Sequence, residues 1–354
     1  MKKLIEKLEK EHSLTLQEYE RLILERTYES SEILRQKALA VRKKIYGNDV
    51  YIRGLIEFTN HCRNDCFYCG IRASNKNVHR YRLTKEEILS CCRQGYGLGF
   101  RTFVLQGGED PFFTDEKLCD IIREIKKNHP DCAITLSLGE RSKKSYQALF
   151  DAGADRYLLR HESANPLHYQ KLHPENQRLE SRMECLKNLR ACGYAVGAGF
   201  MVGSPFQTAA DLAMDLKFIE EFQPEMCGIG PFIPHRESPF ALYPAGSAEL
   251  TCFLLSVIRL IKPEILLPAT TALGTILPDG RERGILSGAN VVMPNLSPVE
   301  VRKDYSLYDN KICTGEESAQ CRFCLDRKIE AVGYKISVGR GDMINLSKKE
   351  SVQE

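Results

Sequence analysis

The sequence predicts an α/β fold, a closed (β/α)8 barrel of the TIM type with an N-terminal helical arm and a C-terminal extension. Three observations favour this fold. Short apolar runs alternate with amphipathic stretches eight times after residue 51. Polar residues follow most of these runs, at the end where a parallel barrel gathers its functional loops. At 354 residues, the chain has the length of one such barrel with additions at both ends.

The expected organisation is an arm over residues 1–46, the barrel over 47–300 and the extension over 301–354. In the arm, apolar residues such as Leu4 and Leu8 recur at helical spacing. The charged residues between them are expected to form a solvated face. The arm is therefore predicted to pack on a larger body.

The first half of the barrel is predicted as four pairs of a strand and a helix. The first strand, residues 52–58, leads into a cysteine-rich loop, and Thr84 with Glu87 forms a capping box that begins the first helix. Further strands are expected at 102–106, 133–138 and 155–159, and further helices at 115–127, 146–152 and 183–189.

The second half repeats the alternation. Its strands are expected at 195–201, 226–229, 265–269 and 290–293, and its helices at 208–222, 247–261 and roughly 281–287. Eight such units in one chain favour a closed parallel barrel over an open doubly wound sheet.

The charge pattern restricts the class of partner. The 50 basic and 47 acidic residues are interspersed and leave a net charge of +3. A nucleic acid or a membrane surface would select clustered basic residues, so neither partner is expected. Lys2 and Lys3 interrupt the apolar core that a signal peptide needs, and no apolar run approaches the ~18 residues of a membrane span. We therefore expect a cytoplasmic protein.

The chain has 14 cysteines, which divide into two triplets and eight isolated residues. A disulfide framework is typical of small secreted domains, and this chain is neither small nor expected to be secreted. The isolated cysteines lie in helical or strand-like runs and are expected to be buried small apolar residues: Cys91, Cys92, Cys119, Cys132, Cys185, Cys192, Cys227 and Cys252.

The first triplet, Cys62, Cys66 and Cys69, has the spacing C-x3-C-x2-C in the loop after the first strand. Three thiolates can bind one metal centre but leave a four-ligand site incomplete. A 4Fe-4S cluster with one iron open to another ligand fits this number of thiolates. The alternatives are a Cys3His zinc site closed by His61 and, less favoured, an incidental group of thiols.

The triplet, with Tyr68 just before its last cysteine, resembles the signature of the radical S-adenosylmethionine (SAM) superfamily. The resemblance implies that the amino and carboxylate groups of SAM bind the open iron. It also implies that the reduced cluster passes one electron to SAM and breaks its C5'–S bond, which gives methionine and a 5'-deoxyadenosyl radical. A reductant such as ferredoxin or flavodoxin is then required, while the protein supplies ligation, geometry and exclusion of water.

Other stretches are similar to SAM-binding segments of that superfamily. Gly107-Gly108-Glu109 follows a strand and resembles the glycine motif whose bare backbone approaches the methionyl amino group, although a tight turn ending at Pro111 is the alternative. Residues 199–205 resemble the segment that contacts adenine. Glu162 and Arg182 are candidates for the ribose hydroxyls and the carboxylate of SAM, because a guanidinium can donate two parallel hydrogen bonds. A surface salt bridge is the alternative for this pair.

The second triplet, Cys313, Cys321 and Cys324, has the spacing C-x7-C-x2-C in the extension. Its last two cysteines form a recurrent chelating pair. The triplet favours a second iron-sulfur cluster, a 2Fe-2S cluster with a fourth ligand other than cysteine. Scattered thiols in the extension are the alternative.

The longer stretches resemble one family of the superfamily, the FeFe-hydrogenase maturase HydE family of the biotin synthase-like group. The resemblance runs from Ile52 to Cys324 and is carried by residues 105–111, 135–140, 155–162, 228–235, 268–272 and 288–295. It implies a full barrel with a cavity along its axis and a role in H-cluster assembly with other maturation factors. The implied substrate is a sulfur-containing, cysteine-bound iron carbonyl cyanide species.

The same resemblance implies roles for individual residues. Those implied to bind SAM are Tyr68, Gly107, Gly108, Glu109, Thr135, Ser137, Glu162, Arg182, Met201 and Met226. Those implied to act in catalysis or to face the substrate are Arg160, Glu162, Thr270, Thr271, Met293, Tyr305 and Tyr308. This sequence departs from the resemblance at Gly107, where a serine would contact SAM, and at Phe200 and Phe206, where small residues are expected.

Three other functions remain open. A methylornithine synthase-like enzyme would rearrange lysine in a similar barrel. A biotin synthase-like enzyme is less favoured, because the sequence lacks the barrel-interior ligand pattern of its sacrificial 2Fe-2S cluster. A non-catalytic iron-sulfur or zinc scaffold would bind metal without cleaving SAM.

Overall fold

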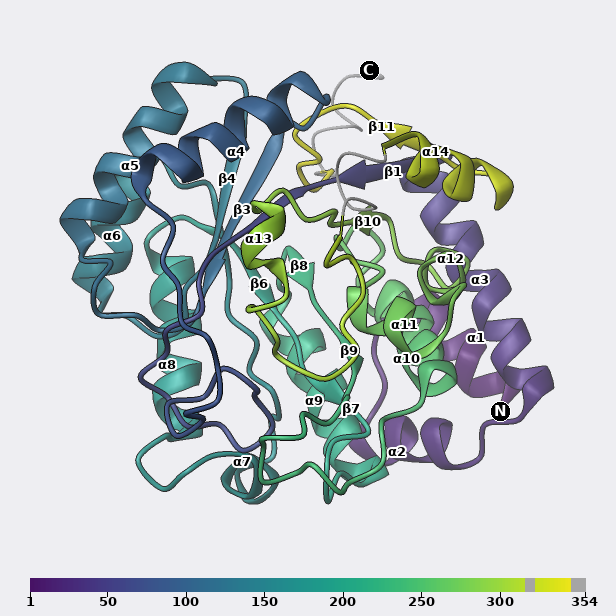
Figure 1. The fold of residues 1–354 in the computed structure, drawn as a ribbon. Helices are drawn as coiled ribbons and strands as arrows, with labels where there is room; N and C mark the ends of the chain where they lie inside the picture. The colour runs from purple at the N-terminus through teal and green to yellow at the C-terminus, as the bar shows by residue number, and fades with distance from the viewer. Residues whose placement is uncertain (316–321, 345–354) are drawn as a thin grey trace.

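A main sheet of parallel strands forms the centre of the molecule. The computed structural model describes residues 1–315 and 322–344, whose arrangement is shown in Figure 1. The strands of the sheet lie in the order in which they occur along the chain: β2 (Gly54–Thr59), β3 (Thr102–Gly107), β4 (Ala133–Ser137), β5 (Arg156–Leu158), β6 (Ala195–Ala198) and β8 (Met226–Cys227). Sequential parallel neighbours are the pattern of a (β/α)8 barrel.

Two short stretches close this sheet into a barrel. The parallel bridges that complete the ring join Met226 to Leu266, Pro268 to Val291 and Asn295 to Leu55. Val291 belongs to β10 (Val291–Val292), and the Leu55 N–H donates to the Pro294 carbonyl at 2.9 Å. The predicted closed barrel is therefore confirmed. Its seventh and eighth strands, predicted at 265–269 and 290–293, make fewer ladder contacts than the other six.

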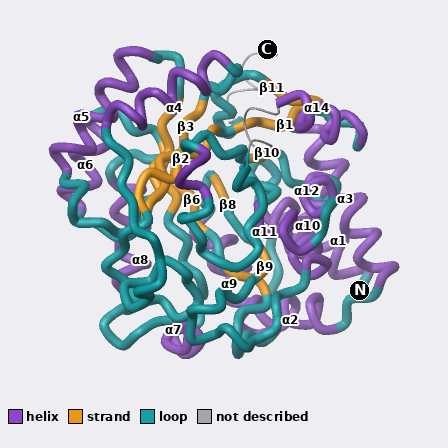
Figure 2. The backbone as a smooth tube through the Cα atoms, viewed as in Figure 1, coloured by secondary structure: helices purple, strands orange, loops and turns teal. Residues whose placement is uncertain are grey.

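Helices surround the strands, as Figure 2 shows. Those that follow the barrel strands are α4 (Lys85–Gly97), α5 (Asp115–Asn128), α6 (Lys143–Asp151), α7 (Pro166–Leu172), α8 (Leu179–Ala191), α9 (Ala209–Phe222), α10 (Ala248–Ile261), α11 (Thr271–Ile276), α12 (Gly280–Ile285) and α13 (Val299–Arg302). The predicted capping box is present, because Thr84 Oγ1 accepts from the Glu87 N–H at 3.2 Å at the start of α4. Within the described residues, the helices are too short or too polar to cross a membrane.

The N-terminal residues fold as three helices, α1 (Lys2–Glu11), α2 (Leu16–Leu24) and α3 (Tyr28–Tyr46). Helix α2 packs against α9, and α3 packs against α10. The contacts agree with the helical spacing in the sequence. Leu8 and Leu34 are completely buried, because the apolar face of each helix is turned toward the barrel helices.

One predicted strand is interrupted. Residues 195–201 were expected as a single strand, but β6 ends at Ala198 and the chain continues as β7 (Met201–Val202), which pairs with β9 (Gly230–Pro231). Gly199 separates the two with φ +154, and a Cβ there would lie 2.1 Å from the Gly228 carbonyl oxygen. The close approach of two backbones therefore breaks the strand.

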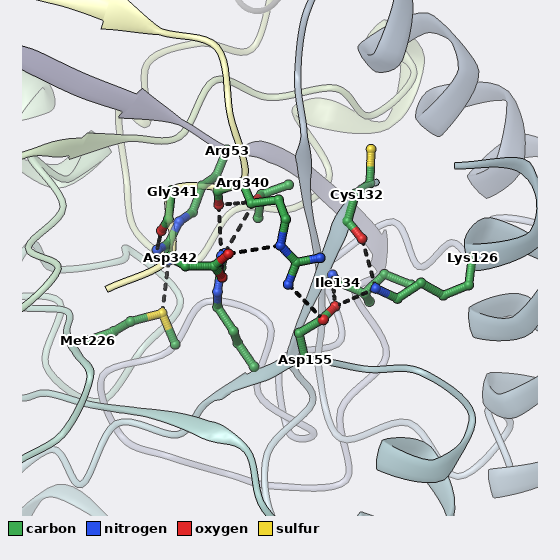
Figure 3. A network of polar contacts seen from close by, with 11 residues as sticks. Arg53, Lys126, Cys132, Ile134, Asp155, Met226, Arg340, Gly341 and Asp342 are labelled. Carbon is green, nitrogen blue, oxygen red and sulfur yellow. Dashed lines mark hydrogen bonds and ion pairs between the residues drawn. The ribbon is translucent and has the colours of Figure 1, made fainter. Parts of the chain in front are cut away.

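A polar network covers the N-terminal ends of the barrel strands (Figure 3). There β11 (Lys335–Ser337) pairs with β1 (Asp49–Ile52), and the chain then runs beneath the barrel. Arg156 Nη2 lies 2.6 Å from Asp342 Oδ1, and Arg340 Nη2 lies 2.9 Å from Asp155 Oδ1. The segment after α14 (Arg322–Ala331) thus neutralises buried charge at this end of the barrel.

Most of the isolated cysteines behave as expected. Cys91, Cys92, Cys119, Cys132, Cys185, Cys192 and Cys227 are buried free thiols, and Cys252 is partly exposed. Burial raises the pKa of these thiols, for example to about 11 for Cys91. They serve as small apolar residues of the core.

Candidate active site

The cysteine loop follows β2 and is held in place by protein contacts. Asn60 Nδ2 donates to the carbonyl oxygens of His79 and Asp304, both at 2.8 Å. The Arg80 guanidinium donates to the backbone carbonyls of Asn60, Ile71, Arg72 and Asn75. The loop is therefore ordered by its own polar side chains and by the segment around Asp304.

The thiols of Cys62, Cys66 and Cys69 lie close enough to affect one another electrostatically. Burial raises the pKa of all three, to about 12 for Cys66, and a bound metal would displace their protons. In residues 1–315 and 322–344, no group of three or more His, Cys, Asp or Glu side chains could hold a single metal ion. A 4Fe-4S cluster sets a different requirement, since its thiolates bind separate irons.

The glycine motif packs directly on the cysteine loop. A Cβ on Gly108 would lie 2.2 Å from the His61 carbonyl oxygen and 2.8 Å from Cys62 Cβ, so only glycine fits. The Glu109 N–H donates to Cys62 Sγ at 3.4 Å, a contact that stabilises thiolate charge. The Glu109 carboxylate instead accepts from Arg63 Nε at 3.0 Å and lines an outer hollow. The motif thus supports the cluster ligands through its backbone.

A cavity of about 320 Å³ opens at the C-terminal ends of the strands and reaches Cys69. Most of the predicted site residues line it: Tyr68, Cys69, Gly107, Ser137, Arg160, Glu162, Arg182, Met201, Thr270, Thr271, Met293, Tyr305 and Tyr308. They come from the ends of several strands and from the segment that follows the barrel. Folding therefore gathers residues into one cavity that are far apart in the sequence.

Four predicted SAM positions lie outside this lining: Gly108, Glu109, Thr135 and Met226. Thr135 is buried in β4, and its Oγ1 has no hydrogen-bond partner among the described residues. Met226 Sδ accepts from Arg53 Nη1 at 2.9 Å, in the network at the other end of the barrel (Figure 3). The placement of Met226 favours a packing role.

Glu162 is held in an unusual conformation by its neighbours. Its φ is 65°, and its N–H donates to the Gly199 carbonyl at 3.0 Å. The Gly199 N–H donates to His161 Nδ1 at 3.3 Å, and burial lowers the pKa of His161 to about 3. The neutral imidazole therefore carries its proton on Nε2 and donates to Asp215 at 3.2 Å. These contacts fix the Glu162 carboxylate in the cavity, 3.2 Å from Arg160 Nη2.

Arg182 is bound from two sides. Its Nε donates to Glu140 Oε1 at 2.7 Å, and its Nη1 donates to the Arg160 carbonyl at 3.0 Å. Glu162 and Arg182 do not pair with each other: both are buried, Glu162 faces Arg160 and Arg182 pairs with Glu140. Their contacts with SAM remain predictions.

Three polar residues of the lining were not predicted: Glu57, Gln106 and Lys311. Glu57 is the single charged residue of strand β2, between the apolar residues Ile56 and Phe58, and that interruption could have indicated a special position. Gln106 precedes the glycine motif by one residue. Lys311 belongs to no recognisable sequence pattern. Its Nζ lies 2.5 Å from Glu57 Oε1, a contact that only the fold creates.

Comparison with known proteins places this site in a family. The Radical SAM superfamily profile matches residues 56–219. The FeFe hydrogenase maturase subunit HydE of Thermotoga maritima is 47% identical over 305 residues, which cover 86% of this chain and 87% of that protein. The chain belongs to the HydE family. It is a radical SAM enzyme, and the resemblance found in the sequence is confirmed.

Solved structures support the same fold for this HydE family member. A crystal structure of methylornithine synthase (PylB) has a TM-score of 0.82 at 25% identity and covers 99% of each chain. A crystal structure of HydG, described as a maturase of the FeFe-hydrogenase, has a TM-score of 0.80 at 21% identity and covers 95% of this chain and 75% of that one.

Membership of the HydE family implies a 4Fe-4S cluster and SAM as cofactors. The residues present fit both. Three partly exposed thiols share one loop, and the Glu109 N–H is directed at one of them. Two buried donors of the adjoining cavity, Arg160 Nε and the Thr270 hydroxyl, make no hydrogen bond within the described residues. These unpaired groups suit a polar cofactor such as SAM.

Proposed function

We propose that this enzyme acts on a sulfur-containing, cysteine-bound iron carbonyl cyanide species during FeFe-hydrogenase H-cluster assembly. The observation that carries the proposal is the set of unpaired hydrogen-bonding groups in the cavity. Arg160 Nε and the Thr270 hydroxyl are buried and make no hydrogen bond within the described residues. A buried donor without a partner costs about 1–3 kcal/mol unless a ligand satisfies it. Carbonyl, cyanide and carboxylate groups would supply the acceptors.

Different residues would bind the cluster, bind SAM and orient the substrate. Cys62, Cys66 and Cys69 would hold the cluster, and Glu162 and Arg182 would bind SAM. When bound, the cluster and SAM supply a 5'-deoxyadenosyl radical. Tyr68, Gly107, Ser137 and Met201 would also contact SAM. The remaining lining residues would orient the substrate and exclude water: Arg160, Thr270, Thr271, Met293, Tyr305 and Tyr308.

Lysine, the substrate of the methylornithine synthase alternative, fits the charges of the cavity less well. Its two ammonium groups require carboxylate partners. The lining contains two carboxylates, and each already faces a cation of the protein: Glu57 with Lys311 and Glu162 with Arg160. A biotin synthase-like reaction has no specific observation in its favour.

The test is anaerobic. The reconstituted enzyme is reduced with SAM in the presence of the cysteine-bound iron dicarbonyl cyanide complex or of lysine, and SAM-derived products are quantified by mass spectrometry. Product that depends on the iron complex supports the proposal. Turnover of lysine alone would replace it with the mutase function, and absence of SAM cleavage under all conditions would favour a scaffold.

We also propose a 2Fe-2S cluster in the extension. Cys313 is partly exposed, and its Sγ lies 3.2 Å from Arg281 Nη2, a cation that would stabilise a thiolate. Cys324 lies in α14, whereas Cys321 lies outside the described residues. A Cys313→Ser variant should lose the 2Fe-2S absorption and electron paramagnetic resonance signals and retain those of the 4Fe-4S cluster. Unchanged spectra would contradict this second cluster.

The proposed reductant is an acidic one-electron carrier of the ferredoxin or flavodoxin type. At the outer face of the cysteine loop, the Glu109 and Asp110 carboxylates are buried, whereas the side chains of their partners Arg63 and Arg82 are 59% and 35% exposed. The face therefore presents positive charge. Salt should slow SAM cleavage driven by such a carrier and should leave cleavage driven by dithionite unchanged.

The remaining proposals concern the setting. We place the enzyme in the cytoplasm, where the free thiols of its barrel would remain reduced. It would act there with the other hydrogenase maturation factors. Its substrate would be a small molecule, and neither a nucleic acid nor a membrane would be a partner. Fractionation of cells that express the enzyme tests this location.

A further inference from the structure

An ion pair in the cavity wall connects the barrel to the segment that follows it. Lys311 Nζ lies 2.5 Å from Glu57 Oε1, and the two side chains are 9% and 1% exposed. Glu57 belongs to β2, whereas Lys311 lies after α13. Both residues line the cavity that reaches Cys69. Removing charges from water is costly, so a buried pair in a functional cavity calls for a functional explanation.

The Glu57 carboxylate already has its partners. Its Oε2 accepts from Asn295 Nδ2 at 2.8 Å, and its Oε1 accepts from Lys311. Asn295 is itself fixed, because its Oδ1 accepts from the Ser297 N–H at 2.8 Å. Glu57 is therefore a rigid acceptor that positions the ammonium group of Lys311.

Lys311 has hydrogen-bonding capacity to spare. A lysine ammonium carries three donors. Within residues 1–315 and 322–344, Nζ uses two of them, one to Glu57 and one to the Tyr305 carbonyl at 2.9 Å. The third makes no hydrogen bond within these residues. Nζ also lies 4.9 Å from the centroid of the Tyr305 ring, and because Lys311 lines the cavity, the third donor is available to a ligand there.

A second cationic group faces the same cavity from another strand. Arg160 follows β5, which lies three strands from β2 around the barrel. Its Nε has no hydrogen-bond partner among the described residues. Donors on two walls of a cavity of about 320 Å³ suit a small ligand with acceptors at both ends.

We propose that Lys311, held by Glu57, binds the carboxylate of the cysteine part of the substrate, while Arg160 faces the cyanide and carbonyl part. The inference rests on the proposed function and deepens it by assigning the amino-acid end of the substrate to one residue. Because the pair of Lys311 and Glu57 already joins the segment after the barrel to β2, the substrate carboxylate would be bound at this junction.

The first experiment measures turnover of two iron complexes, one bound through cysteine and one through cysteamine, which lacks the carboxylate. Lys311→Met should raise KM for the cysteine complex at least about tenfold and leave KM for the cysteamine complex unchanged. Lys311→Arg should recover part of the loss, because it restores the charge. Lys127→Met, on the exposed end of α5, is the control.

A second measurement separates this inference from the proposed function. Calorimetry of the reconstituted enzyme compares binding of S-methyl-L-cysteine and S-methylcysteamine, whether or not the iron complex is a substrate. The wild type should prefer the probe with the carboxylate, and Lys311→Met should lose the preference. If Lys311→Met still prefers S-methyl-L-cysteine, Lys311 does not bind the carboxylate and the inference is wrong. SAM cleavage without substrate, together with the melting temperature, shows that each variant is folded and loaded.

Discussion

At the scale of single residues, the buried polar groups divide into two classes. Glu57 and His161 have partners at both of their polar atoms, so their positions are fixed by the fold. Arg160 Nε and Thr270 Oγ1 are buried without a hydrogen-bond partner in the described chain. Unpaired groups of this kind are rare in proteins, and here they line the cavity next to the cysteine loop.

Loss of a cysteine from the cysteine loop should remove the cluster, whereas loss of a core cysteine should lower only stability. Cys66→Ala should abolish the 4Fe-4S signal and reductive SAM cleavage, because two thiolates cannot hold the cluster. The matched control is Cys91→Ala in α4, which should cost about 1–2 kcal/mol of stability and keep the cluster. Iron content and 5'-deoxyadenosine yield are measured for both. SAM cleavage by Cys66→Ala would refute the assignment.

The buried imidazole of His173 should make the stability of the folded protein sensitive to acid. His173 is 2% exposed, Tyr68 Oη lies 3.1 Å from its Nε2, and burial lowers its pKa to about 3. The unfolded chain binds a proton near pH 6.5 and the folded chain does not, so stability falls as the pH drops below about 6.5 toward 3. Between pH 7.5 and 5.5 this group should cost about 1.4 kcal/mol. Thermal unfolding of His173→Gln at both pH values should show a smaller loss; an equal loss would contradict the prediction.

The sequence predicted which residues form the site better than it predicted which residues contact one another there. Cys62, Cys66 and Cys69 have a spacing that is informative by itself, and most residues suggested by family resemblance line the cavity. Lys311 and Glu57 were missed because their contact depends on the fold. The roles of the lining residues remain predictions.

At the scale of elements, the alternation of strands and helices was read correctly, and the errors have identifiable causes. The strand expected at 195–201 breaks at Gly199 because the backbone of Gly228 approaches it. Helix α11 was not predicted, because its six residues are too few to show a helical period. Strand β11 is recognisable only through its pairing with β1.

Two glycines at the ends of neighbouring elements form a matched test. Gly108 follows β3, and a Cβ there would meet the backbone of His61 at 2.2 Å; Gly97 ends α4, and a Cβ there would meet nothing within 4 Å. Gly108→Ala should displace the cysteine loop and lower both cluster content and SAM cleavage. Gly97→Ala should raise stability by about 0.5–1 kcal/mol and leave the cluster intact. Equal iron contents in the two variants would disprove this account of the motif.

At the scale of the whole molecule, the barrel has separate coverings at its two ends. Residues after α13 contribute Tyr305, Tyr308 and Lys311 to the cavity at the C-terminal ends of the strands. Residues after β11 contribute Arg340 and Asp342 to the network at the other end. The family resemblance implied Tyr305 and Tyr308, whereas Lys311 and the network at the other end could not be predicted, because they depend on contacts between distant segments.

The second covering predicts a change in stability without a change in chemistry. Asp342→Asn removes the charged partner of Arg156, which is 2% exposed. Asp342 is 55% exposed, so solvent screening limits the expected loss to about 1–2 kcal/mol of unfolding free energy. Denaturant unfolding measures the loss, with Glu330→Gln on the exposed face of α14 as the control. SAM cleavage should stay at the wild-type rate, and a variant as stable as the wild type would show that the pair contributes nothing.

The contact between β2 and the segment around Ser297, which closes the barrel, has a consequence for the synthesis of the protein on the ribosome. The hydrogen bond from the Glu57 N–H to Ser297 Oγ joins residues 240 positions apart. At about 5–20 residues per second, a ribosome makes this stretch in roughly 10–50 s. The thiols of the cysteine loop therefore leave the ribosome well before Leu307, whose carbonyl accepts from the Gly70 N–H at 2.8 Å. For that interval the three thiols lack the surrounding chain that leaves them only partly exposed in the folded enzyme, and oxidants would reach them more easily than in the finished protein.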